Sequence, residues 1–207
     1  TPMTIEDIAS YQAKERPPVC APYRQYRVCG MGPPSSGGIL VAQVLGMLSH
    51  FDLPSMEPFS AEAVHLLVEA SRLAFADRAL YVGDSDFVPV PVRGLVDRAY
   101  LRQRAQLIDS ANRIEDATAG RAGQHAWQWA PDTDPEKGVS TTHFSIRDRY
   151  GNTVSMTASI ERPYGSKIMS QGFLLNNELT DFSFKPMDKG RHVANAVYAG
   201  KRPRSTM

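Results

Sequence analysis

The sequence predicts an α+β protein, with helices in its first half and a β-hairpin in its second half. Residues 60 to 80 carry apolar side chains at helical spacing, whereas residues 141 to 160 alternate between apolar and polar side chains. The 207 residues are enough to bury a core in one large domain or two small ones.

Charge and hydropathy argue against several classes of function. The 23 basic and 22 acidic side chains nearly cancel, so the protein has no global field that would steer nucleic acid or an anionic membrane surface. The longest apolar run, residues 39 to 48, is broken by Gln43 and Gly46 and is too short to span a bilayer. The first seven residues lack the basic and apolar regions of a signal peptide. We therefore expect neither nucleic-acid binding nor a membrane span.

The first elements are a short helix and a cysteine hairpin. Thr4 is suited to cap a helix over residues 5 to 9. Cys20 and Cys29 lie opposite each other if the chain turns midway between them, at Arg24-Gln25. The spacing allows either a cross-strand disulfide or two buried free thiols, and an oxidising compartment would favour the disulfide. Two cysteines cannot form a structural zinc site.

Three longer helices are expected to build the core. Residues 39 to 48 are apolar nearly all round, which predicts a central helix capped by a serine. The small residues 35 to 38 before it suit either an anion site or tight packing, and the missing P-loop lysine favours packing. A further helix at about 96 to 108 should carry its arginines on its outer face. The helix that begins at Ser60 is expected to bury the stripe Val64, Leu67, Val68, Ser71, Phe75 and Ala79.

Two segments between these elements read as loops. Residues 81 to 91 hold Asp84 and Asp86, which resemble a loose cation motif but lack the other oxygen ligands of a calcium loop. Residues 109 to 140 are polar and have no sustained period, which predicts a linker that tolerates a backbone cut. We therefore divide the chain into residues 1 to 140, which end in this linker, and residues 141 to 207.

The hairpin that follows sets two hydroxyl groups side by side. If Asp148 pairs with Asn152, Gly151 takes the left-handed position and the numbers of cross-strand partners add to 300. Thr141 then faces Ser159 with the Cβ atoms about 5 Å apart, within hydrogen-bonding reach of the two hydroxyls.

Thr141 is the candidate nucleophile. A threonine hydroxyl needs a base, and a free α-amino group on Thr141 itself would supply one with a pKa near 8. This requires cleavage of the Ser140-Thr141 bond. A β-branched residue at a strand start is also common for packing alone, so the residues by themselves leave both interpretations open. His143, on the same face, is read as an ordinary polar strand position.

A polar cluster follows an apolar strand further along the chain. Its side chains can cap a turn through bonds to the backbone, or they can receive a substrate ammonium group. The residues alone favour capping. The cluster consists of Asn176, Asn177, Glu178 and Asp181.

Five segments together resemble the gamma-glutamyltransferase (gamma-glutamyltranspeptidase) family. They occur in the family's order across nearly the whole chain. The segments are Met-Gly-Pro-Pro-Ser-Ser-Gly-Gly at 31 to 38; Ala-Asp-Arg at 76 to 78 with Tyr-Val-Gly-Asp at 81 to 84 and Phe-Val at 87 to 88; Thr-Thr-His-Phe-Ser at 141 to 145; Leu-Leu-Asn-Asn-Glu at 174 to 178 with Asp-Phe at 181 to 182; and Lys-Arg-Pro-Arg-Ser-Thr-Met at 201 to 207.

The resemblance implies an N-terminal-nucleophile hydrolase, whose αββα sandwich this chain would form in part. Such a protein is made as a precursor, a zymogen, and cleaves itself into a large and a small subunit that stay paired; Thr141 matches the first residue of the small subunit. The family transfers a γ-glutamyl group from glutathione-like amides to water, amino acids or peptides through a threonyl acyl-enzyme. It implies a periplasmic or extracellular location, and neither a cofactor nor a metal ion.

The resemblance also assigns roles to individual residues. Ser159 matches a position whose hydroxyl supports the nucleophile. Glu161, Glu178 and Asp181 match positions that hold the α-amino group of the glutamyl substrate. Ser205 and Thr206 match a serine pair that binds its α-carboxylate.

Departures from the family pattern leave two alternatives. Glu161 and Glu178 stand where Asn and Gln are frequent, so the pocket is more anionic, and a related acylase acting on another amide is the first alternative. The arginine and glycine pair expected around the substrate lie outside this chain, which would then span the end of the large subunit and the start of the small one. A non-catalytic, uncleaved fragment is the second alternative.

Overall fold

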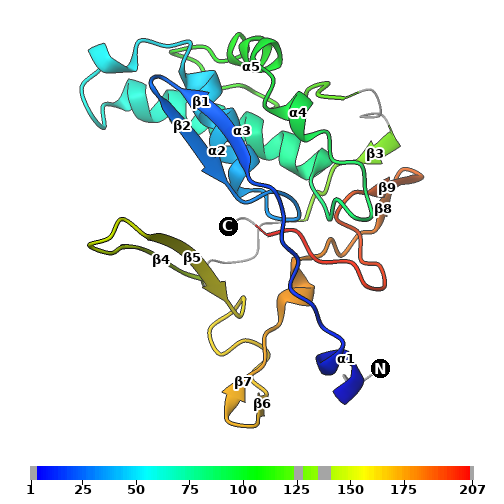
Figure 1. The fold of residues 1–207 in the computed structure, drawn as a ribbon. Coiled ribbons are helices and arrows are strands. Elements are labelled where there is room, and N and C mark those ends of the chain that lie inside the picture. The colour runs from blue at the N-terminus through cyan, green and yellow to red at the C-terminus, as the bar shows by residue number, and fades with distance from the viewer. Residues whose placement is uncertain (1–3, 124–127, 135–140, 206–207) are drawn as a thin grey trace.

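The computed structural model describes residues 4–123, 128–134 and 141–205, and these contain the mixture of helices and strands that the sequence predicts (Figure 1). Two of the site residues predicted above, Ser140 and Thr206, lie outside the described residues. The helices are α1 (Ile5–Ala9), α2 (Gly37–Leu48), α3 (Ala61–Tyr81), α4 (Val92–Leu95) and α5 (Arg98–Ala105), with 3-10 turns at Leu53–Ser55 and Glu178–Asp181. The strands are β1 (Val19–Tyr23), β2 (Tyr26–Gly30), β3 (Trp129–Ala130), β4 (Thr141–Arg147), β5 (Thr153–Ser159), β6 (Met169–Ser170), β7 (Phe173–Leu174), β8 (Met187–Asp188) and β9 (Arg191–Val193).

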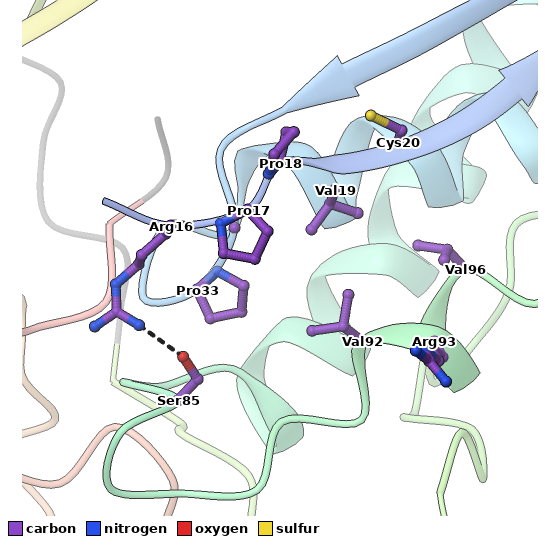
Figure 2. Close-up of a pocket in the computed structure, with 11 residues that line it drawn as sticks. Arg16, Pro17, Pro18, Val19, Cys20, Pro33, Ser85, Val92, Arg93 and Val96 are labelled. Atoms are coloured by element: carbon purple, nitrogen blue, oxygen red, sulfur yellow. Dashed lines mark hydrogen bonds between the residues drawn. The ribbon is translucent and has the colours of Figure 1, made fainter. Parts of the chain in front are cut away.

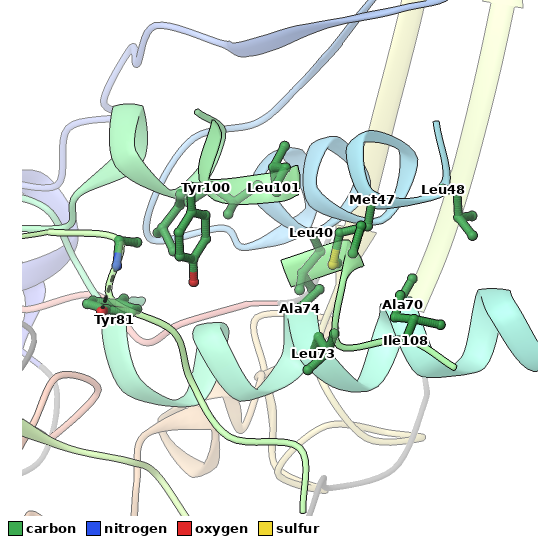
Figure 3. Packing of buried hydrophobic residues seen from close by; sticks show 14 of the residues in the cluster. Leu40, Met47, Leu48, Ala70, Leu73, Ala74, Tyr81, Tyr100, Leu101 and Ile108 are labelled. Atoms are coloured by element: carbon green, nitrogen blue, oxygen red, sulfur yellow. Dashed lines mark hydrogen bonds between the residues drawn. The ribbon is translucent and has the colours of Figure 1, made fainter. Parts of the chain in front are cut away.

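Helix α2 lies at the centre of the core, as its apolar sequence predicts. It packs against α3, α5 and both strands of the β1–β2 hairpin. Figure 3 shows Leu40 and Met47 of α2 facing Leu73 and Ala74 of α3, with Leu101 of α5 above them. These side chains are buried, and such burial is the main stabilising contribution to this half of the molecule.

The start of α2 is packed tightly against backbone, and this confirms the packing interpretation of its small residues. A Cβ atom added to Gly38 would lie 2.6 Å from the carbonyl oxygen of Met31, and one added to Gly30 would lie 2.7 Å from the Cα of Gly38. The serine cap is only partly as predicted. Ser36 is the N-cap residue, but its hydroxyl makes no capping bond to the helix.

The burial of α3 differs from the predicted stripe. Val64, Leu67, Val68 and Phe75 are 39 to 47% exposed, and Ser71 and Ala79 are half-buried. The face that packs against α2 instead mixes apolar side chains with charged ones that have partners inside the fold. Its buried members are Leu66, Glu69, Ala70, Leu73, Ala74, Asp77, Arg78 and Tyr81. Hydropathy alone predicted the wrong face, because paired charges can be buried.

The helix predicted at about 96 to 108 is α5, which is shorter than expected, and a separate short helix, α4, ends just before it at Leu95. The Asp97 carboxylate accepts hydrogen bonds from the backbone N–H groups of Ala99 and Tyr100, and so caps a new helix start. Arg104 was expected on the outer face but is buried, where its guanidinium donates to the carbonyls of Leu73 and Thr118.

Both predicted hairpins form in the predicted registers. Cys20 pairs with Cys29 across β1 and β2, and the two are joined by a disulfide. In β4 and β5, every cross-strand pair from Thr141 opposite Ser159 to Arg147 opposite Thr153 fits the predicted register. Gly151 has a φ of 91°, the left-handed conformation expected of it.

The described strands form four small sheets: β1–β2, β3–β9–β8, β4–β5 and β6–β7. Within the described residues, these strands therefore do not form the two stacked sheets of an αββα sandwich. The β4–β5 hairpin stands apart from the helices in Figure 1, and the side chains of β4 are exposed on both of its faces. Across the described part of the chain, no helix combines the length and the hydropathy needed to cross a membrane.

Candidate active site

Thr141 and Ser159 lie at the open end of the β4–β5 hairpin. The Thr141 hydroxyl donates a hydrogen bond to the Ser159 Oγ over 3.0 Å, as the register predicts. The Ser159 Oγ also accepts the backbone N–H of Glu161 at 3.0 Å. Thr141 is exposed, so an incoming substrate can reach its hydroxyl. His143 is two residues away, and its ring nitrogens bond to hydroxyls of Ser145, Ser155 and Thr157.

Glu161 follows directly after this hairpin in a strained backbone conformation. Its φ is 71°, a region that side-chain-bearing residues rarely adopt, and its side chain is buried. Asn177 donates its amide to the Glu161 carboxylate, and the guanidinium of Arg162 lies 3.6 Å from the same carboxylate. The strained bend therefore holds a buried negative charge next to Ser159.

Glu178 and Asp181 add two more carboxyl groups to the cluster. Partial burial, and then the negative charge of Asp181 and a hydrogen bond shared with it, raise the pKa of Glu178 above its ordinary value. The Ser159 hydroxyl bonds to Glu178 and opposes this rise, while the charge of Glu161 adds to it. The Ser159 hydroxyl thus connects the Thr141 hydroxyl to the carboxyl group of Glu178, which in turn interacts with those of Asp181 and Glu161.

Such a cluster has a clear chemical preference. The charges of Asp181 and Glu161 raise the cost of ionising Glu178, and a bound ammonium group would relieve that cost through charge-assisted hydrogen bonds. The site therefore suits a substrate with a positively charged amine, placed a short distance from the Thr141 hydroxyl.

The structure brings together Thr141, Ser159, Glu161, Glu178 and Asp181, whereas the contacts of Ser205 are with a different segment. Within the described residues, the hydrogen bonds of Ser205 go to the segment that leads into α2: its carbonyl accepts from Ser36, and its N–H donates to the carbonyl of Pro34 at 3.3 Å. Ser35 and Ser205 form a parallel β-bridge.

Sequence reasoning undervalued Asn177 and missed Arg162. Asn177 was expected to cap a turn, and its side-chain oxygen does accept the backbone N–H of Arg162 at 3.2 Å, but its amide also holds the Glu161 carboxylate. Capping within the polar cluster is clearest at Asn176, which accepts the backbone N–H of Glu178 at 3.0 Å. Only the fold reveals these partners, because 16 residues separate Asn177 from Glu161.

Asp84 and Asp86, the loose cation motif, bind side-chain cations instead of a metal ion. Asp84 accepts from Arg16 at 3.0 Å, and Asp86 pairs with both Arg16 and Lys14. Across the described ranges, no group of three or more His, Cys, Asp or Glu side chains is arranged to hold a metal ion.

A cavity of about 370 Å³ is lined by residues outside the Thr141 cluster (Figure 2). The wall of this cavity is mostly apolar. The guanidinium of Arg16, which lines it, already donates to Ser85 and pairs with Asp84 and Asp86. None of the predicted site residues contributes to it. Its lining consists of Arg16, Pro17, Pro18, Val19, Cys20, Gly32, Pro33, Ser85, Val92, Arg93 and Val96.

The whole chain that carries this hydroxyl and carboxylate cluster can be compared with known proteins. The family model described as gamma-glutamyltranspeptidase matches residues 1–207, the whole chain. The chain belongs to the gamma-glutamyltranspeptidase family.

Relatives within the gamma-glutamyltranspeptidase family include both hydrolases and acylases. The chain is 40% identical to the glutathione hydrolase proenzyme of Escherichia coli, over 99% of this chain and 35% of that protein. It is 36% identical to the acylase ACY 1 proenzyme of a Pseudomonas species, over 97% of this chain and 33% of that protein. The crystal structure of cephalosporin acylase from Bacillus halodurans superposes with a TM-score of 0.75 at 26% identity, over 99% of this chain and 33% of that one. The chain thus spans about a third of the length of the curated relatives it matches.

Proposed function

We propose that residues 1–207 carry part of the active site of a γ-glutamyl transferase and hydrolase, with Thr141 as its nucleophile. The observation that carries the proposal is the hydrogen bond of Thr141 to Ser159, whose hydroxyl also meets the carboxyl cluster. The substrate is a γ-glutamyl amide such as glutathione. Its α-ammonium binds among Glu161, Glu178 and Asp181, and this places the γ-carbonyl against the Thr141 hydroxyl.

The first chemical step is acyl transfer to Thr141. Its Oγ1 attacks the γ-carbonyl carbon, and the hydroxyl proton passes to the free α-amino group of the same residue. The resulting tetrahedral intermediate breaks its C–N bond, and the leaving amine takes that proton. Ser159 accepts the hydrogen bond of Thr141 in the resting state and so orients the hydroxyl. A γ-glutamyl ester on Thr141 remains.

The second step releases the glutamyl group. Water, an amino acid or a peptide attacks the ester carbonyl and gives its proton to the α-amino group of Thr141. The C–O bond to threonine then breaks, and the proton returns to Oγ1. Glutamate is the product with water, and a new γ-glutamyl amide is the product with an amine acceptor.

The α-amino group requires prior cleavage of the Ser140-Thr141 bond. We propose that Thr141 Oγ1 attacks the Ser140 carbonyl, shifts the acyl group from nitrogen to oxygen, and that water hydrolyses the ester. The two products stay together as large and small subunits within an αββα sandwich. Contacts that cross the cleavage point support pairing: the buried Arg204 guanidinium lies 3.0 Å from the Asp132 carboxylate, and the backbone N–H of Arg202 donates to Asp84. The disulfide supports a periplasmic or extracellular location, since such compartments are oxidising.

An acylase that acts on another amide is the second candidate, and the acylase relatives favour it. The three carboxyl groups argue for the γ-glutamyl substrate instead. A glutaryl or adipyl group has no ammonium to offset the charges of Glu161, Glu178 and Asp181, so its binding would leave these charges uncompensated.

The test uses the full-length precursor with Thr141→Ala and Thr142→Ala. Thr142 is a matched control, since it is the neighbouring threonine and points to the other face of β4. We expect mass spectrometry to find a fragment that begins at Thr141 in the wild type and in Thr142→Ala. Thr141→Ala should stay uncut and lose turnover of a γ-glutamyl anilide by at least about 1,000-fold.

Three results would contradict parts of this proposal. Equal turnover in Thr141→Ala and wild type would exclude Thr141 as the nucleophile. A wild-type chain that remains intact after prolonged incubation would favour the non-catalytic alternative. Faster hydrolysis of glutaryl or adipyl anilide than of γ-glutamyl anilide would favour the acylase.

A further inference from the structure

The segment that contains Ser205 is anchored along its length to the part of the chain before the cleavage point and to the 194–196 turn. The backbone N–H of Arg202 donates to the Asp84 carboxylate, and the backbone N–H of Arg204 donates to the side-chain oxygen of Asn195, both at 2.9 Å. Asn195 and Asp84 are fully buried. Residues 202 to 204 are therefore held by hydrogen bonds to buried side chains.

Ser36 fixes Ser205, the residue after this segment, through two hydrogen-bond donors. Its backbone N–H and its hydroxyl both donate to the carbonyl oxygen of Ser205, at 2.9 and 2.7 Å. Ser36 is fully buried and lies 169 residues away from Ser205 in the sequence. Two converging donors fix both the position and the orientation of a peptide plane, and the Ser205 carbonyl belongs to the peptide that joins Ser205 to its successor.

Arg78 sets the direction of the Ser36 hydroxyl. The Nε–H of this buried arginine donates to Ser36 Oγ at 2.9 Å. Because Ser36 Oγ accepts from Arg78, its own hydrogen is free to point at the Ser205 carbonyl. This chain of bonds explains why the hydroxyl of Ser36 does not cap α2, although Ser36 is its N-cap residue.

From these contacts we infer that Ser36 is a positioning residue for recognition of the substrate α-carboxylate, with Arg78 acting through it. The inference rests on the proposed function and on the role that the family resemblance implies for Ser205, which is to bind that carboxylate. Ser36 does not touch the substrate; it fixes the peptide plane that follows Ser205 through two hydrogen bonds to the Ser205 carbonyl. Because Ser36 precedes the proposed cleavage point and Ser205 follows it, these bonds join the two subunits across the site.

The experiment measures substrate selectivity in the full-length precursor after maturation. Two anilides are compared: γ-glutamyl anilide, and 4-aminobutanoyl anilide, which keeps the amine but lacks the α-carboxylate. The variants are Ser36→Ala, the conservative Ser36→Thr, and Ser35→Ala. Ser35 is a matched control, because it is the adjacent buried serine and its hydroxyl has no hydrogen-bond partner among the described residues.

We expect Ser36→Ala to raise KM for γ-glutamyl anilide about tenfold, the effect of one lost hydrogen bond, with kcat within about twofold. KM for 4-aminobutanoyl anilide should stay within about twofold. Ser36→Thr should restore most of the selectivity, and Ser35→Ala should behave as the wild type. Arg78→Lys, which removes the Nε–H donor and keeps the charge, should show a smaller loss in the same direction and provides a second route if Ser36→Ala fails to mature.

The possible failures are distinguishable. A wild-type enzyme without γ-glutamyl turnover would overturn the proposed function and the inference with it. Normal wild-type turnover with equal KM values in Ser36→Ala and Ser35→Ala would overturn the inference alone. So would an equal rise of KM for both anilides, because that pattern indicates a general structural defect.

Discussion

At the scale of single residues, the same carboxyl groups that suit an ammonium group make the site sensitive to pH. Burial and the neighbouring charges of Asp181 and Glu161 raise the pKa of Glu178 in the folded protein. The folded state therefore binds a proton that the unfolded chain would release. The stability from this proton is present below the ordinary carboxyl range and is lost as the pH rises through the raised pKa of Glu178.

Substrate binding should show the opposite trend with pH. As Glu178 loses its proton, the cluster gains a negative charge and attracts the ammonium group more strongly. We expect KM for γ-glutamyl anilide to fall as the pH rises through the acidic range above the ordinary carboxyl pKa. In Glu178→Gln, which cannot ionise, this part of the KM profile should be flat. A profile that is the same in both proteins would show that Glu178 does not contact the ammonium.

Asp77 shows how a motif residue can serve the fold. Its buried carboxylate accepts hydrogen bonds from Gln43 at 2.8 Å, from the Tyr100 hydroxyl at 2.6 Å and from the N–H of Gly120 at 2.9 Å. Arg104 lies 3.4 Å away as its counter-ion. Burial and the Asp77 charge raise the pKa of Tyr100, so its hydroxyl stays a donor.

We expect Asp77→Asn to lower the free energy of unfolding by about 3 kcal/mol, because it leaves the Arg104 charge buried without a counter-ion. Denaturant unfolding of the uncleaved Thr141→Ala precursor would measure this loss. Asp116→Asn, at an exposed position, is the control and should change stability by less than about 0.5 kcal/mol. A loss as small as that control in Asp77→Asn would contradict the role of Asp77.

At the scale of elements, the two predicted hairpins are stabilised by different interactions. The β4–β5 hairpin has seven cross-strand pairs and a tight loop, in which the Asp148 carboxylate accepts from the N–H groups of Tyr150 and Asn152. The β1–β2 hairpin has five pairs, packs on α2, and is closed by the Cys20–Cys29 disulfide.

The double variant Cys20→Ser, Cys29→Ser should be less stable than the wild type by about 2.5 kcal/mol, because the unfolded chain loses the constraint of a ten-residue loop. Thermal melting in the presence and absence of a reductant would measure this. Reductant should bring the wild type down to the level of the variant and leave the variant unchanged. A wild type that is insensitive to reductant would show that the disulfide contributes little.

At the scale of the whole molecule, two apolar faces lack a cover among the described residues. One lies on α3 and includes Val64, Leu67, Val68 and Phe75; the other lies on the hairpin and includes Phe144, Ile146, Val154 and Met156. Their residues are 39 to 58% exposed, which is unusual for contiguous large side chains in a monomeric protein. Since the curated relatives are about three times as long as this chain, we expect other parts of a full-length protein to cover both faces.

This expectation can be measured with a fluorescent apolar dye. The 207-residue chain by itself should bind the dye, and Leu67→Glu with Val68→Glu should reduce that binding. In the full-length precursor the dye should bind weakly, and the same two substitutions should lower the yield of soluble protein. Equal dye binding by the two lengths of wild-type chain would show that the faces stay open.

The sequence by itself determined the features that depend on neighbours along the chain. Hairpin register follows from loop length and alternation, so the pairing of Thr141 with Ser159 and of Cys20 with Cys29 could be predicted, as could the central helix α2. The segments that resemble the family could be read in the same way, since they are local patterns.

Only the tertiary structure decided what depends on distant partners. Asn177 meets Glu161, Ser36 meets Ser205, and Arg104 is buried beside Asp77, although no local period links any of these pairs. The predicted stripe on α3 was wrong for the same reason. Charged side chains can be buried when an interaction with a distant partner offsets the cost of their desolvation. Local geometry fixed where Thr141 points, and long-range packing set the charges and anchors around it.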